Sequence, residues 1–372
     1  MLKILITGDY CPVGRIETLI KNDNANLVFN NFIDVINEHD IRITNLESPF
    51  VDKGEGIDKT GPYLKADEKA IEGLSYSGFN LVTLANNHIM DYGKNGLFNT
   101  MRLLDNHNID YVGAGSNKED ARKISYIDST EGIIAILNFA ENEFSNTFND
   151  MPGANPHHTI NNYYDIQEAK KKAKYIIVIY HGGNEMHSLP SPRIKETFRF
   201  FADVGADIVV SHHTHCFSGY EIYNGTPIFY GLGNFIFDYN QSKSWLWSSG
   251  FALSLTIKDK ISFEIKPFLQ NYYKNVGVHL MDANNLIRFN KELIWINSII
   301  KDDQKLEIEF DKMTQKRKKQ YLNYLEPYEK KIFVALRNRG FIPSSLSKKK
   351  KLLLTNLIRC EAHRDIVLKI LN

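Results

Sequence analysis

Residues 209–217, VVSHHTHCF, place three histidines within four positions directly behind an apolar run. Each neutral imidazole needs a hydrogen-bond partner, and crowded imidazoles repel one another once they are protonated. We therefore interpret His213 and His215 as ligands of a cation. They are two positions apart, so on an extended segment their side chains point in the same direction. The alternative is a set of core histidines whose partners lie within the protein.

Other apolar runs of the same kind precede this one. Each is short and rich in Val, Ile and Leu, as buried strands are. The expected strands cover residues 2–8, 41–47, 80–87, 132–140, 174–183, 207–213 and 227–235. Helical spacing of apolar residues lies between several of them, at 67–78, 96–108 and 191–205. This alternation predicts an α/β fold.

Side chains with nitrogen or oxygen ligand atoms follow the expected strands. They are Asp9, Asn45, Glu47, Asn86, Asn87, His88, His181, His213 and His215. In open α/β sheets, ligands bind outside the carboxyl ends of the strands. The mixed set suits Mn²⁺, Fe²⁺ or Zn²⁺ better than it suits a structural zinc site built from cysteines. A carboxylate such as Glu47 can bridge two such ions, and paired ions activate water for displacement reactions.

Each of these signals has a structural alternative when it is taken alone. Asp9 fits a turn or a helix cap, and Asn87 with His88 fits the start of a following helix. His181 beside two glycines fits a tight turn. Cys11 fits a small buried side chain or a thiolate ligand. The joint occurrence of these residues, each behind a strand, favours the metal site.

Composition and charge describe a globular chain with a basic end. The 372 residues are 43% hydrophobic and 24% charged. Residues 301–372 carry 18 Lys and Arg against 9 Asp and Glu, or +9, whereas residues 1–300 carry 27 against 35, or −8. The basic tail is either a solvated helical face or a surface for peripheral contact with something anionic, such as a membrane. We expect no nucleic-acid partner.

The cysteines and the N-terminus bear on the compartment. Three cysteines, Cys11, Cys216 and Cys360, are too few and odd in number for a disulfide framework, which indicates a reducing environment. The opening MLKILITGDY lacks the pattern of a signal peptide. No apolar run approaches the roughly 18 residues that a membrane-spanning helix needs. We therefore expect a cytoplasmic protein without a membrane span.

The order GD, NLE, NNH, HGG and HxH resembles the calcineurin-like metallophosphoesterase superfamily. Within it, residues 84–100, 111–115 and 205–238 resemble the CapA family, the bacterial poly-γ-glutamate capsule biosynthesis proteins. The likeness spans about residues 2–268. It implies a four-layer α/β/β/α metallophosphoesterase-like sandwich at 1–270, followed by a basic, mostly helical extension at 271–372.

The resemblance also implies roles for individual residues. It assigns two divalent ions, either Mn²⁺, Fe²⁺ or Zn²⁺, to ligands at Asp9, Glu47, Asn87, His181, His213 and His215. Glu47 takes the bridging position. His88 takes the place of the general acid that protonates the leaving oxygen, and it acts with Asn87 and Glu47 as the catalytic set. Asn45, Glu185 and His212 are expected to face the substrate.

Two departures from the family pattern concern the same site. The opening Asp-x-His of the superfamily reads Asp9-Tyr10-Cys11, so the first ion loses a histidine ligand. CapA-like chains commonly have His-Trp-Gly where this chain has His181-Gly182-Gly183, and the loss of that aromatic ring opens the pocket.

The expected function is a divalent-metal-dependent hydrolase, phosphoesterase-like, in the biosynthesis of a capsule or exopolymer. Its substrate is then a phosphorylated or polymeric small molecule or glycan, of the poly-γ-glutamate or polysaccharide kind. Two alternatives stay open. One is a non-catalytic or accessory metal-binding component of a capsule polymer synthesis or export complex. The other is an amide-bond hydrolase that acts on glutamyl polymers through the same site.

Overall fold

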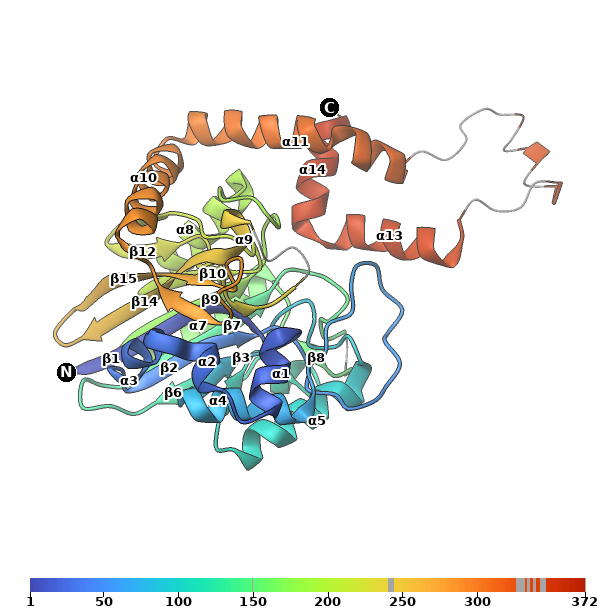
Figure 1. Ribbon diagram of the computed structural model, residues 1–372. Coiled ribbons are helices and arrows are strands. Elements are labelled where there is room, and N and C mark those ends of the chain that lie inside the picture. The colour runs from blue at the N-terminus through green and yellow to red at the C-terminus, as the bar shows by residue number, and fades with distance from the viewer. Residues whose placement is uncertain are drawn as a thin grey trace.

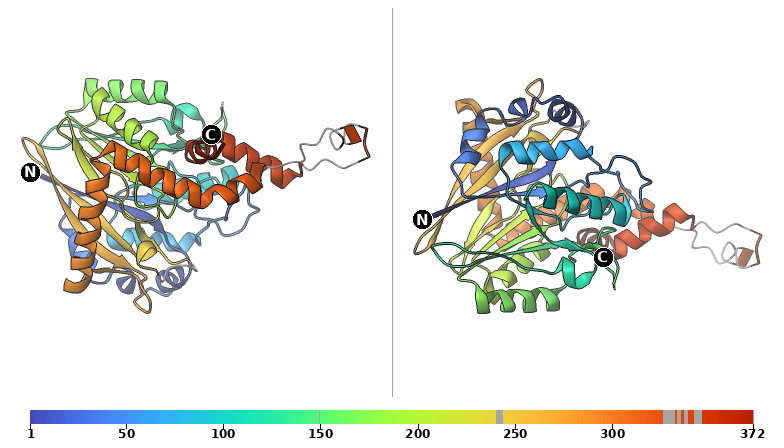
Figure 2. Two further views of the ribbon diagram at one scale, coloured as in Figure 1. Left: turned by 90° about the horizontal axis from the view of Figure 1, so that it is seen from above. Right: turned by 90° about the horizontal axis from the view of Figure 1, so that it is seen from below.

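Two β-sheets pack face to face, and helices cover both outer faces (Figures 1 and 2). The computed structural model describes residues 1–371 except 149, 240–243, 326–331, 333–334, 337–338 and 342–345. The layers follow the order α/β/β/α, so the predicted fold class is confirmed.

The larger sheet mixes parallel and antiparallel strands. Its order is β16 (Val278–Leu280), β15 (Ile261–Gln270), β14 (Ser249–Ile257), β1 (Leu2–Cys11), β2 (Ile41–Leu46), β3 (Leu81–Thr83) and β4 (Asp110–Val112), and β13 (Asn234–Phe237) also pairs with β1. From β1 to β4 the neighbouring strands are parallel. Their carboxyl ends therefore lie at one edge of the sheet.

The second sheet brings its own parallel strands to the same region. Its order is β11 (Tyr220–Tyr223), β12 (Thr226–Phe229), β10 (Ile208–His212), β9 (Tyr175–His181), β7 (Ile134–Ala140) and β6 (Ser125–Ile127). The strands β7, β9, β10 and β12 are parallel to one another. A small ladder joins β5 (Ala114–Gly115) to β8 (Gly153–Ala154).

Alternating side chains on the strands explain the layers. On β1, Ile4 and Ile6 join the core between the sheets, whereas Leu5 joins the core beneath the outer helices. Successive residues of a strand point to opposite faces, so a continuous apolar run serves both cores.

The helices fall into two groups. On the larger sheet lie α1 (Arg15–Lys21), α2 (Asn26–Phe29), α3 (Ile33–Asn37), α4 (Glu72–Ser77) and α5 (Gly93–Asn106), with the 3₁₀ helices η1 (Asn30–Phe32) and η2 (Glu68–Ile71). On the second sheet lie α7 (Thr159–Lys172) and α8 (Pro192–Val204). The single turns α6 (Lys118–Ala121) and α9 (Trp245–Ser248) sit in connecting segments. Ser191 caps α8 through a bond to the amide of Ile194, and Pro192 follows it.

Three expected strand boundaries were wrong: the run 80–87 is strand only over Leu81–Thr83, and glycine explains the other two. The run 227–235 forms two strands in different sheets, β12 and β13, because the chain turns at Gly233, whose φ is +82°. The first strand continues past Gly8 to Cys11. A Cβ at Gly8 would lie 1.7 Å from the carbonyl oxygen of Gly233, so glycine there permits close backbone approach rather than ending the strand.

Beyond the sheets the chain is helical. The helix α10 (Ala283–Ile300) packs Phe289 against Phe217 at a ring-centroid distance of 4.7 Å. The helices α11 (Asp303–Leu325), α13 (Lys348–Arg359) and α14 (Glu361–Leu371) share a small apolar core, formed by Phe310, Met313, Tyr321, Leu357, Ile366 and Ile370. Figure 1 shows α11 running across the body toward α13 and α14. We call α11, α13 and α14 the extension helices. Within the described part of the chain, none of the helices combines the length and the apolarity needed to cross a membrane.

Candidate metal centre

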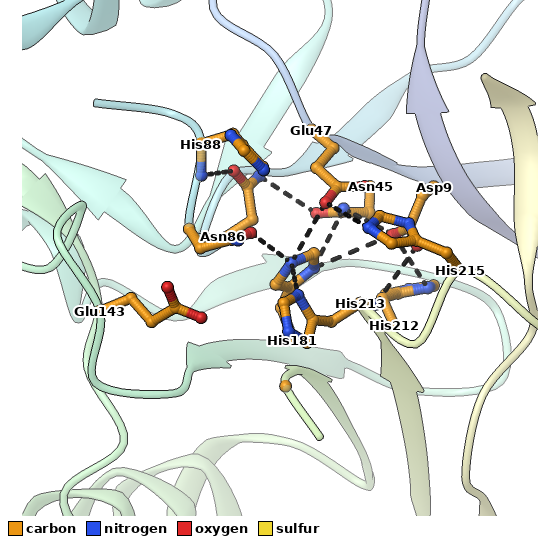
Figure 3. A network of polar contacts seen from close by, with 12 residues as sticks. Asp9, Asn45, Glu47, Asn86, His88, Glu143, His181, His212, His213 and His215 are labelled. Atoms are coloured by element: carbon orange, nitrogen blue, oxygen red, sulfur yellow. Dashed lines mark hydrogen bonds and ion pairs between the residues drawn. The ribbon is translucent and has the colours of Figure 1, made fainter. Parts of the chain in front are cut away.

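The strand ends of the two sheets meet at one cluster of buried polar side chains (Figure 3). Asp9 of β1 lies beside Asn45 of β2 in the register of the larger sheet. In the second sheet, His181 at the end of β9 pairs with His212 at the end of β10. The register of parallel strands therefore delivers acidic and amide groups from one sheet and imidazoles from the other.

Glu47 belongs to both groups of side chains that can hold a metal ion. One group contains Glu47, His181 and His213, and the other contains Asp9, Glu47 and His215. Within each group the ligand atoms lie within 4.8 Å of one another. The Oε1 atom of Glu47 is 3.6 Å from His181 Nε2 and 3.7 Å from His215 Nε2. One Glu47 oxygen therefore lies close to an imidazole from each of the two groups.

The carboxylate of Glu47 also supplies a test of whether a cation fits. Glu47 is fully buried, and neither of its oxygens has a hydrogen-bond partner among the described residues. A buried carboxylate without partners is costly, and coordination of metal ions satisfies it. The donor set of carboxylate oxygens, an amide oxygen and imidazole nitrogens is also the set that divalent transition metals accept. The residues present therefore fit bound divalent metal.

Asn45 and Asn87 connect the two groups. Asn45 donates from Nδ2 to Asp9 Oδ1 at 2.8 Å, and the same nitrogen lies 3.2 Å from His181 Nδ1. The amide oxygen of Asn87 lies 2.9 Å from His181 Nε2, and His213 Nδ1 lies 3.1 Å from that same nitrogen. Ligand-type atoms of Asn87 and His213, from two separate loops, thus lie close to the nitrogen of His181 at the end of β9.

The local backbone at His213 and His215 differs from the expected extended segment. The strand β10 ends at His212, and His213 and His215 have φ angles of +83° and +55°. Their rings nevertheless lie 5.9 Å apart, and the amide of His213 donates to Asp9 Oδ2 at 3.2 Å. Positive φ is uncommon outside glycine and often marks functional loops. The turn, and not strand alternation, brings the two imidazoles together.

His88 is held by a carboxylate that the sequence reading missed. His88 Nδ1 lies 2.7 Å from Asp91 Oδ2, which leaves Nε2 as the nitrogen available to other groups. Asp91 is buried, pairs with Lys59 and accepts from the amide of Leu64 at 2.7 Å. The His-x-x-Asp spacing at 88–91 is the sequence signal that would have indicated this pair. Asn87 and His88 do not cap a helix, because α5 begins at Gly93.

Asn86 and Asn234 are further residues with supporting contacts. Asn86 accepts from the amides of His88 and Ile89 at 3.1 and 2.9 Å, so it shapes the loop that carries His88. Asn234 Oδ1 lies 3.0 Å from His215 Nδ1, which leaves His215 Nε2 directed toward Glu47. Such partners fix the tautomer and the orientation of a ligand imidazole. The sequence pattern did not indicate Asn234 as a site residue, because its strand β13 was expected to be the end of one longer strand at 227–235.

Burial dominates the electrostatics of the cluster. It raises the pKa of Asp9 and, together with the charge of Asp9, raises the pKa of Glu47 well above its ordinary value. Burial lowers the pKa of His213 and His215, and burial with neighbouring imidazoles lowers the pKa of His181 far below its usual value. Protons are therefore unfavourable on these imidazoles. Neutral imidazoles and ionised carboxylates are the forms that bind metal.

Three other residues considered from the sequence occupy different places. His212 is buried with its Nδ1 atom 3.9 Å from Asp9 Oδ1, and burial lowers its pKa to about 3. Cys11 is buried beside Phe237 and Trp247, and burial raises the pKa of its thiol. This favours a small packed side chain over a thiolate ligand. Glu185 follows the loop after His181 and lines a cavity next to the cluster.

The cavity has a volume of about 510 Å³. Asn87, His88 and His213 line it on the side of the metal-binding cluster, together with Lys59 and Glu185. A volume of this size is typical of sites for small ligands. His212, Asp9 and Asn45 are not among its lining residues, so of the three expected substrate-facing residues the structure places Glu185 at the cavity.

Comparisons with known proteins agree with this geometry. A family model described as "Bacterial capsule synthesis protein PGA_cap" matches residues 3–239. The chain is 34% identical over 244 residues to the PGA biosynthesis protein CapA of Bacillus subtilis (strain 168), which covers 64% of each chain. It is 29% identical over 246 residues to the capsule biosynthesis protein CapA of Bacillus anthracis, which covers 64% of this chain and 60% of that one. The match thus spans less than two thirds of either relative.

Among solved structures, one described as a novel phosphatase from Mycoplasma pneumoniae is similar to this chain. Its TM-score is 0.45 at 16% identity, and the likeness covers 78% of this chain and 98% of that one. These values indicate a distant likeness only.

Proposed function

The chain belongs to the bacterial capsule synthesis protein family, and from this premise we propose that it is a metal-dependent hydrolase. The proposed reaction is the hydrolysis of a phosphoester in a precursor or an end group of a capsule polymer. Glu47 lies in both metal-binding groups, and His88 lines the adjoining cavity. These two positions support a dinuclear hydrolytic site over a single structural ion.

Each residue of the cluster has a defined task in the proposal. Asp9, Glu47 and His215 would hold the first ion, and Glu47, Asn87, His181 and His213 would hold the second. When bound, the ions supply charge stabilisation and an activated water. Asn45 holds Asp9 in place through its 2.8 Å bond. Asn234 holds His215 with Nε2 directed toward Glu47.

The observation that carries the proposal is the pairing of His88 with Asp91. Asp91 accepts from Nδ1–H, so in the doubly protonated ring the Nε2 proton is the one that passes to the oxygen of the departing group, which leaves a neutral ring with its proton on Nδ1. A site that only binds metal has no need of a histidine at the edge of a cavity whose ring is oriented by a carboxylate that stabilises its protonated form. The phosphoester assignment rests on this donor together with a bridging carboxylate.

A second candidate is an accessory, non-catalytic role in a capsule polymer synthesis complex. It is favoured by position 11, where a buried Cys stands in place of the superfamily's histidine, so the first ion has three ligands from Asp9, Glu47 and His215. Hydrolysis of an amide bond in a glutamyl polymer uses the same groups on a carbonyl carbon. The same set of residues serves both reactions, so only the substrate panel below distinguishes them.

The experiment uses the purified full chain. Bound metal is quantified after dialysis, and turnover is measured with Mn²⁺ on phosphate monoesters, phosphate diesters and γ-glutamyl amides. The variants are His88→Ala and Asn87→Ala, with His158→Asn as a matched control, because His158 is exposed and caps α7, a role that Asn retains. Phosphoester turnover that collapses in both variants and persists in the control supports the enzyme. Stoichiometric metal without turnover on any substrate supports the accessory role.

A further inference from the structure

The extension helices form the second wall of the cavity beside the metal centre. From α11, α13 and α14 the cavity is lined by Arg317, Gln320, Tyr321, Leu353, Asn356 and His363. The family model ends at residue 239, so this wall lies outside the matched segment. Side chains of these helices share the cavity with His88 and His213.

Buried polar contacts fix this wall to the body. Asn142 donates to both carboxylate oxygens of Glu361, at 3.2 Å from its amide and 2.5 Å from Nδ2. Lys195, which is buried, donates to Asp303 at 2.6 Å. Both contacts join residues more than a hundred positions apart in the chain. Charge-assisted bonds with buried partners hold their groups in defined positions.

Two amide side chains in the cavity have an atom without a partner. Asn184 is 5% exposed and Asn356 is 8% exposed. Within the described residues, Asn184 Nδ2 and Asn356 Oδ1 make no hydrogen bond, and both residues line the cavity. A buried polar atom without a partner costs free energy, and a bound ligand relieves that cost. The cavity thus presents one unmatched donor from the body and one unmatched acceptor from the extension.

The remaining polar lining is rich in donors. Arg317 uses Nη2 to donate to the carbonyl oxygen of Glu185 at 2.8 Å, which holds the guanidinium at the cavity. Its planar fork has five N–H donors and suits a carboxylate. Burial and the charge of Glu185 raise the pKa of Glu143 to about 8, so Glu143 is a neutral donor at pH 7. Among the lining residues, the carboxylate of Glu185 would repel a bound anion. The ammonium of Lys59 also lines the cavity, but it is paired with Asp91.

The position of His88 decides which part of a substrate meets this wall. A general acid lies next to the oxygen of the group that departs. Because His88 and Asn87 line the cavity on one side and the extension helices line it on another, the departing group occupies the space between them. The wall therefore contacts the departing group, while the metal ligands contact the phosphoryl group.

We propose that the extension helices select the substrate by binding its departing group, with Arg317 receiving a carboxylate and Asn356 receiving a neighbouring N–H donor. This assignment rests on the proposed function. It names the substrate class as a phosphoester whose departing group carries a carboxylate next to an ammonium or amide nitrogen, small enough to fit the cavity or presented as a chain end.

A pair of ligands that differ by one carboxylate tests this without turnover. The phosphonate analogues of phosphoserine and of phosphoethanolamine both carry an ammonium, and one of them carries the carboxylate. Calorimetry on the Mn²⁺-loaded full chain is expected to show about tenfold tighter binding of the phosphoserine analogue, the value of one charge-assisted bond. Arg317→Gln is expected to reduce this ratio to about one. Asn356→Leu is expected to weaken both ligands by a similar factor.

Matched variants on the same helices serve as controls. Lys318→Gln removes an exposed charge next to Arg317, and Thr355→Val removes an exposed hydroxyl next to Asn356, so both should bind like the parent chain. Equal affinity for the two analogues, no binding of either, or a ratio that Arg317→Gln leaves unchanged would overturn the assignment. Arg317→Lys controls for misfolding, because lysine keeps the positive charge but lacks the planar set of N–H donors of arginine. Turnover of p-nitrophenyl phosphate tests the proposed function separately, since this substrate has no carboxylate.

Discussion

Arg193 of α8 and Asp365 of α14 are joined by a hydrogen bond of 2.5 Å from Nε to Oδ2. The same guanidinium pairs through Nη2 with Glu141, and Glu141 accepts from the amide of Gly183 at 2.8 Å. One half-buried cation therefore connects the extension to the loop that follows His181. The extension and the metal centre are coupled by contiguous polar contacts as well as by the cavity between them.

Removal of one charge from this connection should loosen the extension selectively. In Asp365→Asn, Arg193 keeps its bond to Glu141, so we expect faster hydrogen exchange in α13 and α14 and little change in the sheets. The expected loss of unfolding free energy is about 1 kcal/mol, because the Asn side chain keeps an acceptor for Arg193 and only the charge assistance of the bond is lost. Glu309→Gln is the control, since its exposed pair with Lys312 contributes little. Unchanged exchange in α14 would show that this contact does not fix the extension.

Removal of the cation from the same contact should lower the unfolding free energy much more than Asp365→Asn does. Arg193→Met leaves Glu141 buried without its cation, and burial already raises the pKa of Glu141. An uncompensated buried charge typically costs about 3–5 kcal/mol. Urea unfolding followed by tryptophan fluorescence measures this, and the double variant Arg193→Met, Glu141→Gln should recover most of the loss. A double variant as unstable as Arg193→Met would refute the explanation.

Glu47→Gln should separate metal affinity from stability. The amide keeps the volume of the carboxylate but removes the charge that both metal groups share, so we expect metal content to fall toward zero at both positions. In metal-free protein the same change should raise the unfolding free energy by about 1–3 kcal/mol, because a buried Glu47 must either carry a charge without partners or hold a proton at a raised pKa, and the amide needs neither. The two measurements are metal analysis after dialysis and urea unfolding with a chelator.

The control for this change is Glu221→Gln. Glu221 is also buried, but it is bound by Arg199 at 2.9 and 2.8 Å and lies away from the cluster. It should retain metal and lose stability, the reverse of Glu47→Gln. If Glu47→Gln keeps two ions per chain, the bridging role is wrong.

Asp91→Asn should lower turnover through its effect on His88, and the size of the loss should depend on the departing group of the substrate. Asp91 is a positioning residue, since it touches His88 and Lys59. General acid catalysis contributes a hundredfold or more, so a loss of about tenfold to a hundredfold is expected for alkyl phosphates. The loss should be several times smaller for p-nitrophenyl phosphate, whose departing group needs no proton. Asp105→Asn, an exposed change at the end of α5, is the control. Equal losses on both substrates would indicate a structural role only.

The layered fold and the meeting of the ligand residues follow from local rules of sequence. Apolar runs of strand length alternate with helical spacing, and parallel strands put their carboxyl ends at one edge. Asp9, Glu47 and His181 could therefore be placed together from strand ends alone. The turn at His213 and His215 could not, because it depends on positive φ angles that no short sequence pattern specifies.

What the sequence left out depends on contacts between distant segments. Gly233 takes the chain from one sheet to the other. Its carbonyl accepts from the amide of Asp9 and lies against Gly8, and this contact is visible only once both strands are in place. Asn356 lies 269 positions after Asn87, yet both line one cavity. A periodic pattern describes the buried face of a helix, but it does not say against which part of the body that helix packs. The boundary expected at residue 270 stays a prediction.

Acid should weaken the packing of the extension through His363. His363 Nδ1 lies 2.7 Å from the hydroxyl of Tyr321, and burial lowers the pKa of His363 to about 4, with Arg317 and His213 adding to the decrease and Glu185 opposing it. Between pH 6.5 and 4 the unfolded chain binds a proton here that the native chain does not, so stability is complete above the unfolded pKa and falls as the pH decreases. At pH 5 the loss from this residue is up to about 2 kcal/mol.

The measurement compares urea unfolding at pH 7 and pH 5 in the presence of a chelator, so that metal release does not contribute. His363→Gln keeps an acceptor for Tyr321 but cannot bind the proton. Between pH 7 and pH 5 its unfolding free energy should therefore fall by about 1–2 kcal/mol less than that of the parent chain. Other histidines whose pKa is lowered by burial, such as His157 with a pKa of about 4, reduce the stability of both chains by the same amount. Their contribution therefore cancels in the comparison. His158→Asn, an exposed change, should follow the parent. Parallel curves for His363→Gln and the parent would show that His363 is not held neutral by the fold.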